Sequence, residues 1–148
     1  MSKGLRGQFN HNIDAKGRLI VPAKFRELLG EEFVVTKGLD HCLFGYPNEE
    51  WDLFEEKLRK LPIQNKKARQ TKHFFISCAT DCEIDSQGRI LIPSVLREFA
   101  GLEKEVAIVG NGESIEIWDR EVWDSMSNDI ADNMDDIVEE LDDLGIEF

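Results

Sequence analysis

The chain has 148 residues, 41% of them apolar, and a net charge of -12, which suits one compact domain or two small halves that share a core. It has no apolar run near the roughly 20 residues of a membrane helix and no secretory leader, so we expect a cytosolic protein without a membrane partner. Its three cysteines, Cys42, Cys78 and Cys82, lack the spacing of a disulfide framework and fit a reducing compartment.

The negative charge is concentrated at the C-terminal end. From Asp119 onward there are twelve acidic residues and one arginine, so residues 1–118 carry a net charge of only -1. Two segments are basic: residues 1–30 have a net charge of +4, and residues 57–73 hold seven lysines and arginines and no acid. Two basic segments beside an acidic tail indicate a polyanion-binding protein more strongly than the net charge suggests.

One motif occurs twice, as NIDAKGRLIVP at Asn12–Pro22 and as EIDSQGRILIP at Glu83–Pro93. A shift of 71 residues aligns the two copies through residue 30, and a shift of 72 aligns the segments that follow, pairing Val34 with Val106. The repeated unit of about 50 residues occurs only twice, which is too few for a solenoid. We therefore predict two similar halves that close on one shared core.

In chain order, the first copy begins with a strand, a turn and a returning strand, QFNHNID, AKG and RLIVP. The sequence Asp-Ala-Lys-Gly is typical of a hairpin turn with glycine in the left-handed conformation. PAKFRELLG is predicted to be a short helix from Pro22 to Gly30. FVVTK and CLFGY then form a second hairpin, and NEEWDLFEEKLRKLP forms a longer amphipathic helix.

A basic linker, KKARQTKH from Lys66 to His73, joins the copies. It either contacts a DNA backbone or forms a solvated helix face that pairs with neighbouring acids. We expect Cys78 and Cys82 to share one face of the strand that follows. We predict no metal site and no cofactor, because His73 and these two cysteines do not have a zinc spacing.

The second copy repeats the order of elements, with EVAIV and SIEIW as a hairpin around the turn GNGE. An acidic tail follows, with apolar residues spaced by three to four positions, so it is predicted to be an amphipathic helix. This helix either packs on its own core or a neighbour, or competes with DNA for the basic face.

Hairpins from two halves of this size must interleave to bury a core, so the predicted fold is α+β and mainly β. The parts are a first repeat at residues 5–50 and a helix with the basic linker at residues 51–75. A second repeat at residues 76–120 and an acidic amphipathic C-terminal helix or tail at residues 121–148 complete the chain.

Each copy of the motif places an aspartate and an arginine four residues apart around a glycine. The motif residues are Asp14, Gly17 and Arg18 in the first copy and Asp85, Gly88 and Arg89 in the second. One interpretation is structural: the two side chains pair across the turn and the aspartate caps its amides. The other is functional: the arginine, or a basic residue inside the turn, reaches a phosphate or a base edge, because a two-stranded ribbon fits the major groove.

The stretches IDAKGRLIVPAKFRE and IDSQGRILIPSVLRE resemble the MraZ family, bacterial regulators built from two AbrB-like halves with a D-x-x-x-R signature in each. The resemblance extends from Arg6 to about Trp123, nearly the whole chain. It implies a double-split, swapped-hairpin β-barrel formed within one chain, with flanking helices, and assembly into homo-oligomeric rings. It also implies binding to double-stranded DNA at promoter direct repeats ahead of the division and cell-wall gene cluster, and hence transcriptional control in the nucleoid.

The family's DNA-contact arginine falls on Arg18, with Lys16 in the same loop and Arg6 just before the first strand. In the second copy Gln87 stands in the position of Lys16, so that loop has one charge less and Arg89 is either a contact or a structural partner of Asp85. The predicted DNA-binding residues are Arg6, Lys16, Arg18, Lys3, Lys24 and Arg89.

An enzymatic function is not expected. The chain has no phosphate-binding loop, dinucleotide fingerprint or nucleophile elbow, and its three histidines have no evident nucleophile partner, so no small-molecule substrate is predicted. The alternative to a DNA-binding regulator is an AbrB-like protein-interaction scaffold, such as an antitoxin or assembly factor. In that case the acidic tail is the functional segment.

Overall fold

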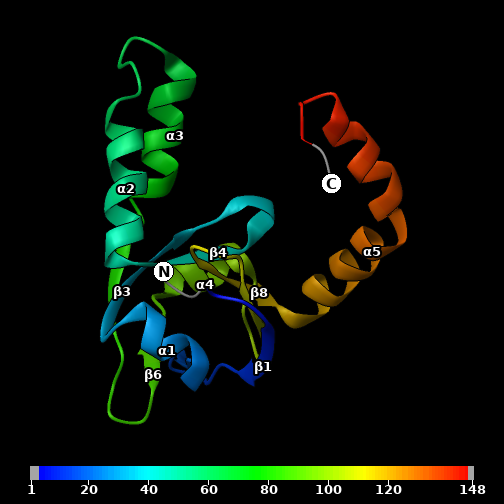
Figure 1. Ribbon diagram of the computed structural model, residues 1–148. Coiled ribbons are helices and arrows are strands. Elements are labelled where there is room, and N and C mark those ends of the chain that lie inside the picture. The colour runs from blue at the N-terminus through cyan, green and yellow to red at the C-terminus, as the bar shows by residue number, and fades with distance from the viewer. Residues whose placement is uncertain (1–3, 147–148) are drawn as a thin grey trace.

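The computed structural model describes residues 4–146 (Figure 1). The first repeat contains β1 (Gln8–Asn12), β2 (Arg18–Ile20), α1 (Ala23–Leu29), β3 (Glu32–Lys37), the 3-10 turn η1 (Leu39–His41) and β4 (Leu43–Pro47). The second contains β5 (Thr80–Glu83), β6 (Arg89–Leu91), α4 (Ser94–Ala100), β7 (Glu105–Gly110) and β8 (Ile115–Asp119). Between them lie α2 (Asn48–Arg59) and α3 (Lys66–Ile76), and α5 (Arg120–Asp142) follows the second repeat.

The strands exchange partners between the two repeats. Six strands form one antiparallel sheet in the order β1-β7-β8-β4-β3-β5, so the first strand of each repeat pairs with the third strand of the other. The strands β2 and β6 form a separate two-stranded ribbon, in which Arg18 lies opposite Leu91 and Ile20 lies opposite Arg89. The prediction that the two halves interleave, and that of an α+β, mainly β fold, are therefore confirmed. The predicted pairing of β1 with β2 as a hairpin is wrong: within residues 4–146 these segments share the single bridge between Ile13 and Leu19, and both strands pair with the other repeat instead.

The six-stranded sheet is open. Its edges, β1 and β5, are not paired with each other within the described residues. The ribbon lies beside both edges, because β2 contacts β1 and β6 contacts β5. The strands therefore surround one core, into which the ribbon places Leu19 and Ile90, each 1% exposed. The closed swapped-hairpin barrel stays a prediction from the family resemblance.

Equivalent side chains of the two repeats fill this core, but the third strands are offset by one residue from the expected alignment. The Ile13 amide donates to the Lys104 carbonyl (2.8 Å), and the Ile84 amide donates to the Glu31 carbonyl (2.8 Å). These equivalent bonds require a shift of 73 residues, so Val106 corresponds to Phe33 rather than to Val34. The loop between α4 and β7 is longer than the loop between α1 and β3, which causes the offset.

Local sequence explains where the helices begin. Pro22 and Pro93 precede α1 and α4, and Asn65 caps α3 by accepting a hydrogen bond from the Ala68 amide (3.1 Å). Asp119 caps α5 in the same way, accepting from the Val122 amide (3.1 Å). No helix within residues 4–146 is long and apolar enough to cross a membrane.

The basic linker is part of a helical hairpin. Helices α2 and α3 lie side by side and project from the sheet (Figure 1), and we call them the arm. Phe54 and Phe75 pack between them with ring centroids 5.1 Å apart. The Thr36 hydroxyl of β3 donates a buried hydrogen bond to the Phe75 carbonyl (2.6 Å), which anchors the arm to the sheet.

Candidate nucleic-acid interface

The Asp14 carboxylate holds the loop between β1 and β2 in place. We call this loop the first loop and the equivalent loop between β5 and β6 the second loop. Its Oδ1 accepts hydrogen bonds from the amides of Lys16 (3.0 Å) and Arg18 (2.8 Å), and its Oδ2 accepts one from the Arg18 Nε (2.6 Å). Gly17 has a φ of 90° and donates its amide to the Asp14 carbonyl (3.0 Å). The predicted turn with a left-handed glycine is therefore confirmed.

The second loop has the same geometry with one chemical difference. The Asp85 Oδ1 accepts from the amides of Gln87 and Arg89 (2.9 Å each), and its Oδ2 accepts from the Arg89 Nε (3.0 Å). Gly88 has a φ of 78°. The exposed side chains inside this loop, Ser86 and Gln87, are neutral, whereas Lys16 gives the first loop a positive charge.

Hydrogen bonding favours the ionised form of both aspartates. The bond from the Arg18 amide is the largest cause that lowers the pKa of Asp14 from its ordinary 3.8 to about 2, and the Arg18 guanidinium acts in the same direction. The Arg89 amide likewise lowers the pKa of Asp85. Both carboxylates therefore stay charged and keep their loop amides bound at neutral pH.

Each loop is also supported by the other repeat. The Gly17 carbonyl accepts from the Ile92 amide (2.8 Å), and a Cβ atom on Gly17 would lie 2.7 Å from the Ile92 carbonyl oxygen and 2.8 Å from the Arg97 Nε. In the second loop, a Cβ atom on Gly88 would collide with the Arg26 guanidinium. These two supporting arginines were not predicted from the sequence, although their identical place in both copies was an available signal.

The outer face of the ribbon presents two arginines and two aliphatic side chains. Alternate residues of a strand share one face, so Arg18 and Ile20 of β2 lie on the same side as Arg89 and Leu91 of β6. Ile20 is 43% and Leu91 59% exposed, and the two arginine side chains are half-buried. The register places the arginines on a diagonal with about 7–8 Å between their Cα atoms. The two aliphatic residues were not predicted as site residues.

The structural interpretation of the motif is correct, and it leaves the functional one open. Arg18 uses its Nε to bind Asp14, but within residues 4–146 no hydrogen bond involves its Nη1 or Nη2 atoms. The same holds for Arg89 and Asp85. Since a guanidinium presents several donors in a planar fork, the aspartate orients the group while its tip stays available to an acceptor on a ligand.

The other predicted basic residues lie at different distances from the ribbon. Lys16 is exposed in the first loop, and Lys24 is exposed in the first turn of α1, two residues before Arg26. Arg6 is exposed at the far end of β1 from the first loop, beside Gly110, so the structure does not bring it to the ribbon face. Lys3 lies outside the described residues.

The cysteines do not form a site with the histidines. Cys78 precedes β5 while Cys82 lies within it, so the expectation that both share one strand face is wrong. Burial raises the pKa of the Cys82 thiol to about 12, which is a property of a core residue. No group of three or more His, Cys, Asp or Glu in the described part of the chain could hold a metal ion.

Comparison with known proteins matches both halves of the chain. A family model described as "MraZ protein, putative antitoxin-like" matches residues 5–74 and again residues 75–144. A relative from Lachnoclostridium phytofermentans, named Transcriptional regulator MraZ, is 56% identical over 142 residues, which cover 96% of this chain and 98% of that protein. Relatives with the same name from Thermoanaerobacter sp. and Limosilactobacillus reuteri are 56% and 55% identical and cover 96% and 97% of this chain and 99% of each relative. A solved structure titled "The solution structure of PHS018 from pyrococcus horikoshii" covers 79% of this chain and 89% of that chain at 18% identity, and its TM-score of 0.32 is too low to support an argument.

Proposed function

Because the chain belongs to the MraZ family, we propose that it is a DNA-binding transcriptional regulator that recognises direct repeats in a promoter. The names of its curated relatives support a regulator and agree with the expectation that the chain is not an enzyme. The family resemblance directs the proposal to the promoter ahead of the division and cell-wall gene cluster. Double-stranded DNA is then the partner, and the nucleoid is the place of action.

The Arg18 guanidinium carries this proposal, because Asp14 orients it on an exposed face and leaves its tip unoccupied. A two-stranded ribbon fits the major groove, where arginine binds the O6 and N7 atoms of guanine. Lys16 adds a phosphate contact, and Ile20 and Leu91 are suited to thymine methyl groups. One such arginine contributes about 1–3 kcal/mol of discrimination between bases.

One ribbon offers few phosphate contacts, so a single copy binds DNA weakly. We propose that several copies assemble into a ring and engage successive repeats, which raises the effective concentration of each ribbon at the next site. Direct repeats suit a cyclic assembly, since each copy meets its site in the same orientation.

Fluorescence anisotropy with the chain's own upstream repeats, against a scrambled duplex, tests this function. The repeats should bind more tightly, affinity should fall steeply between 50 and 200 mM salt, and Arg18→Ala should weaken the specific complex about 10- to 100-fold. Arg120→Ala removes the same charge from a side chain that lies 3.8 Å from Glu105 and should leave binding unchanged. Absence of a preference for the repeats, or an equal loss in both variants, would contradict the proposal and favour the scaffold.

A further inference from the structure

The helices that follow the two repeats are equivalent in sequence but not in packing. Trp51 of α2 corresponds to Trp123 of α5, and Leu58 corresponds to Ile130. Helix α3 packs on α2, and Leu58 is only 4% exposed, whereas Ile130 is 41% exposed. No described residue of α5 is buried, so the apolar stripe of this helix lacks the cover that its counterpart has.

Among residues 4–146, the contacts that anchor helix α5 to the sheet come from its first turns. The Trp123 ring packs 5.5 Å from that of Trp118, and its Nε1 donates to the Gln8 side chain (2.6 Å). Beyond Met126, no described α5 side chain joins either core cluster, and the helix extends away from the sheet (Figure 1). Its stripe continues through Ile130 and Met134, which leaves an uncovered apolar surface along a helix about 35 Å long.

The charge of this helix indicates what could cover it. Helix α5 carries nine acidic side chains and one arginine, a net charge of -8. Three of the carboxylates, Asp129, Asp136 and Glu140, recur at helical spacing along one side of the apolar stripe. Two α5 helices would repel each other, so a partner must combine apolar surface with positive charge.

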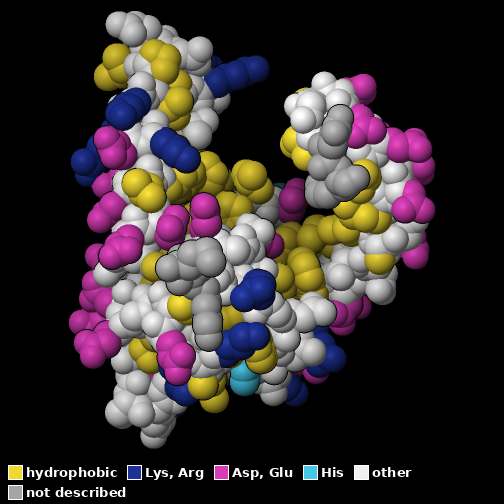
Figure 2. All heavy atoms as spheres, in the orientation of Figure 1, with side chains coloured by type: hydrophobic (Ala, Val, Ile, Leu, Met, Phe, Trp, Pro, Cys, Tyr) yellow, Lys and Arg dark blue, Asp and Glu magenta, His cyan; other side chains and the backbone are white. Residues whose placement is uncertain are grey.

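The tip of the arm, residues 57–69, has both properties. It contains six lysines and arginines and no acid, all six are exposed, and Ile63 at its apex is 68% exposed. Figure 2 shows lysine and arginine side chains on the arm, and it shows acidic side chains along the outer edge of α5 with apolar ones towards the gap. Lys57, Lys66 and Lys67 make no ion pair within residues 4–146, so their charges are available to a partner.

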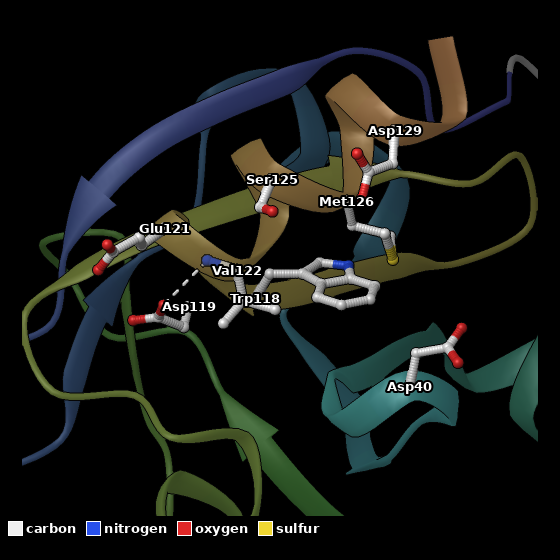
Figure 3. A pocket seen from close by; sticks show the side chains of 8 residues that line it. All are labelled: Asp40, Trp118, Asp119, Glu121, Val122, Ser125, Met126 and Asp129. Carbon is white, nitrogen blue, oxygen red and sulfur yellow. Dashed lines mark hydrogen bonds between the residues drawn. The ribbon is translucent and has the colours of Figure 1, made fainter. Parts of the chain in front are cut away.

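A hollow at the base of α5 provides a matching receptor for a basic side chain. It has a volume of about 500 Å³ and lies between η1 and the first turns of α5. Figure 3 shows the Trp118 ring and Met126 inside it, with Asp40 on one side and Asp129 on the other. A lysine or arginine could place its aliphatic stem on the apolar floor and its charge beside the carboxylates.

The arm and α5 of one copy are apart in the structure, and each is anchored at its base. Figure 1 shows them rising from opposite ends of the sheet, and the space-filling view in Figure 2 shows a gap between them. The arm is fixed by the bond from Thr36 to Phe75, and α5 is fixed by Trp123. Figure 1 also places the loop before β6 at the end of the molecule away from the arm, so the arm tip does not extend the ribbon face.

We propose that the basic arm tip of one copy docks on the acidic, apolar face of α5 of a second copy. This inference rests on the self-association in the proposed function and names the surfaces that produce it. The two surfaces differ, so the contact is head-to-tail. One copy of a pair keeps its α5 free and the other keeps its arm free, and both can bind further neighbours. Such an interface closes into a ring or extends into a chain.

Charge reversal tests the proposal, with the mass of the full chain measured by sedimentation without DNA. An arm variant (Lys57→Glu, Lys66→Glu, Lys67→Glu) and a tail variant (Asp129→Lys, Asp136→Lys, Glu140→Lys) should each fall to the mass of a monomer. An equimolar mixture should recover the assembly, because the acidic arm of one variant meets the basic tail of the other. A control with three exposed carboxylates reversed elsewhere (Glu27→Lys, Glu98→Lys, Glu103→Lys) should keep the wild-type mass.

Three results would overturn the inference. Unchanged mass in both variants would place the interface elsewhere, loss of mass in the tail variant alone would indicate pairing between α5 helices, and a mixture that stays monomeric would rule out the exchange of arms. The affinity of the Arg18→Ala variant for the promoter repeats is measured in the separate anisotropy experiment. If the charge-reversal variants behave as expected in sedimentation but the protein shows no preference for the promoter repeats, only the proposed function is overturned.

Discussion

The two ribbon loops hold their aspartate and arginine alike, with Nε to Oδ2 distances of 2.6 Å and 3.0 Å. They differ at the residue before the glycine, which is Lys16 in one loop and Gln87 in the other. The fold needs the aspartate, the glycine and the arginine Nε, and both copies have them. It does not need the exposed side chain inside the loop, and there the copies differ. The difference separates what shapes the hairpin from what a ligand would require, and it favours the first loop as the stronger contact.

The largest expected difference between the two loops is in the loss of DNA affinity when their arginines are replaced. Arg18→Ala should weaken binding to the promoter repeats about 10- to 100-fold, because the guanidinium tip is lost from the loop that also carries Lys16. Arg89→Ala should cost less than about tenfold. Anisotropy titrations on one duplex measure both. Equal losses would show that the two loops contribute alike.

Substituting the glycines should separate the loops by stability. Gly17→Ala should lower the free energy of unfolding by about 2–3 kcal/mol, because a positive φ is strained for alanine and the new Cβ meets the backbone oxygen of Ile92. Gly88→Ala should cost about 1–2 kcal/mol, since the Arg26 side chain can move aside.

Chemical denaturation of the two glycine variants beside the wild type gives this ranking. Gly112→Ala is a suitable control, because it also has a positive φ but nothing lies within 4 Å of its Cβ position. A larger loss for Gly88→Ala than for Gly17→Ala would contradict the account of the supporting contacts.

Exchanging the side chains of Lys16 and Gln87 between the two loops should have a smaller effect on DNA affinity. Lys16→Gln should reduce affinity severalfold and lower the slope of log affinity against log salt by about one, as expected for the loss of one phosphate contact. Gln87→Lys should change both quantities in the opposite direction if the second loop also approaches the backbone. A salt series on both variants measures the slopes, and an unchanged slope for Lys16→Gln would place that side chain away from DNA.

The smallest expected effect is the titration of the two aspartates. Both pKa values are lowered in the folded protein, so their contribution to stability is present above the ordinary pKa of 3.8 and is lost as the pH falls towards about 2, the value for Asp14. Carboxyl carbon shifts followed by NMR between pH 5 and 1.5 should give a midpoint near 2 for Asp14 and below 3.8 for Asp85. In Arg18→Ala the Asp14 midpoint should rise only in part, because the amide bonds persist. A midpoint at the ordinary value in the wild type would mean that the loop is open in solution.

The sequence predicted the loop turns, the short helices and the hairpins β3–β4 and β7–β8, because turn residues and apolar spacing are local signals. It also predicted that the repeats interleave, but not that β1 and β2 pair with strands of the other repeat instead of with each other. It did not predict that Phe33 and Val106, 73 residues apart, are equivalent. The different lengths of the preceding loops change this alignment, and the composition of the strands does not show it. The sequence predicted the contact between Asp14 and Arg18 but not the exposure of Ile20 and Leu91, because three-residue strands are too short to show which face is buried. The supports from Arg26 and Arg97 depend on contacts between repeats, which no local pattern describes.

The pairing of β1 with β7 has a consequence for how the chain is made. A ribosome adds about 5–20 residues per second, so β1 emerges on the order of 5–20 seconds before its partner strand. During that interval β1 and the ribbon strand β2 are an unsatisfied edge on the nascent chain. Folding of this sheet must therefore wait until β7 has left the ribosome, and a prematurely released first repeat would be left to pair with strands of another molecule.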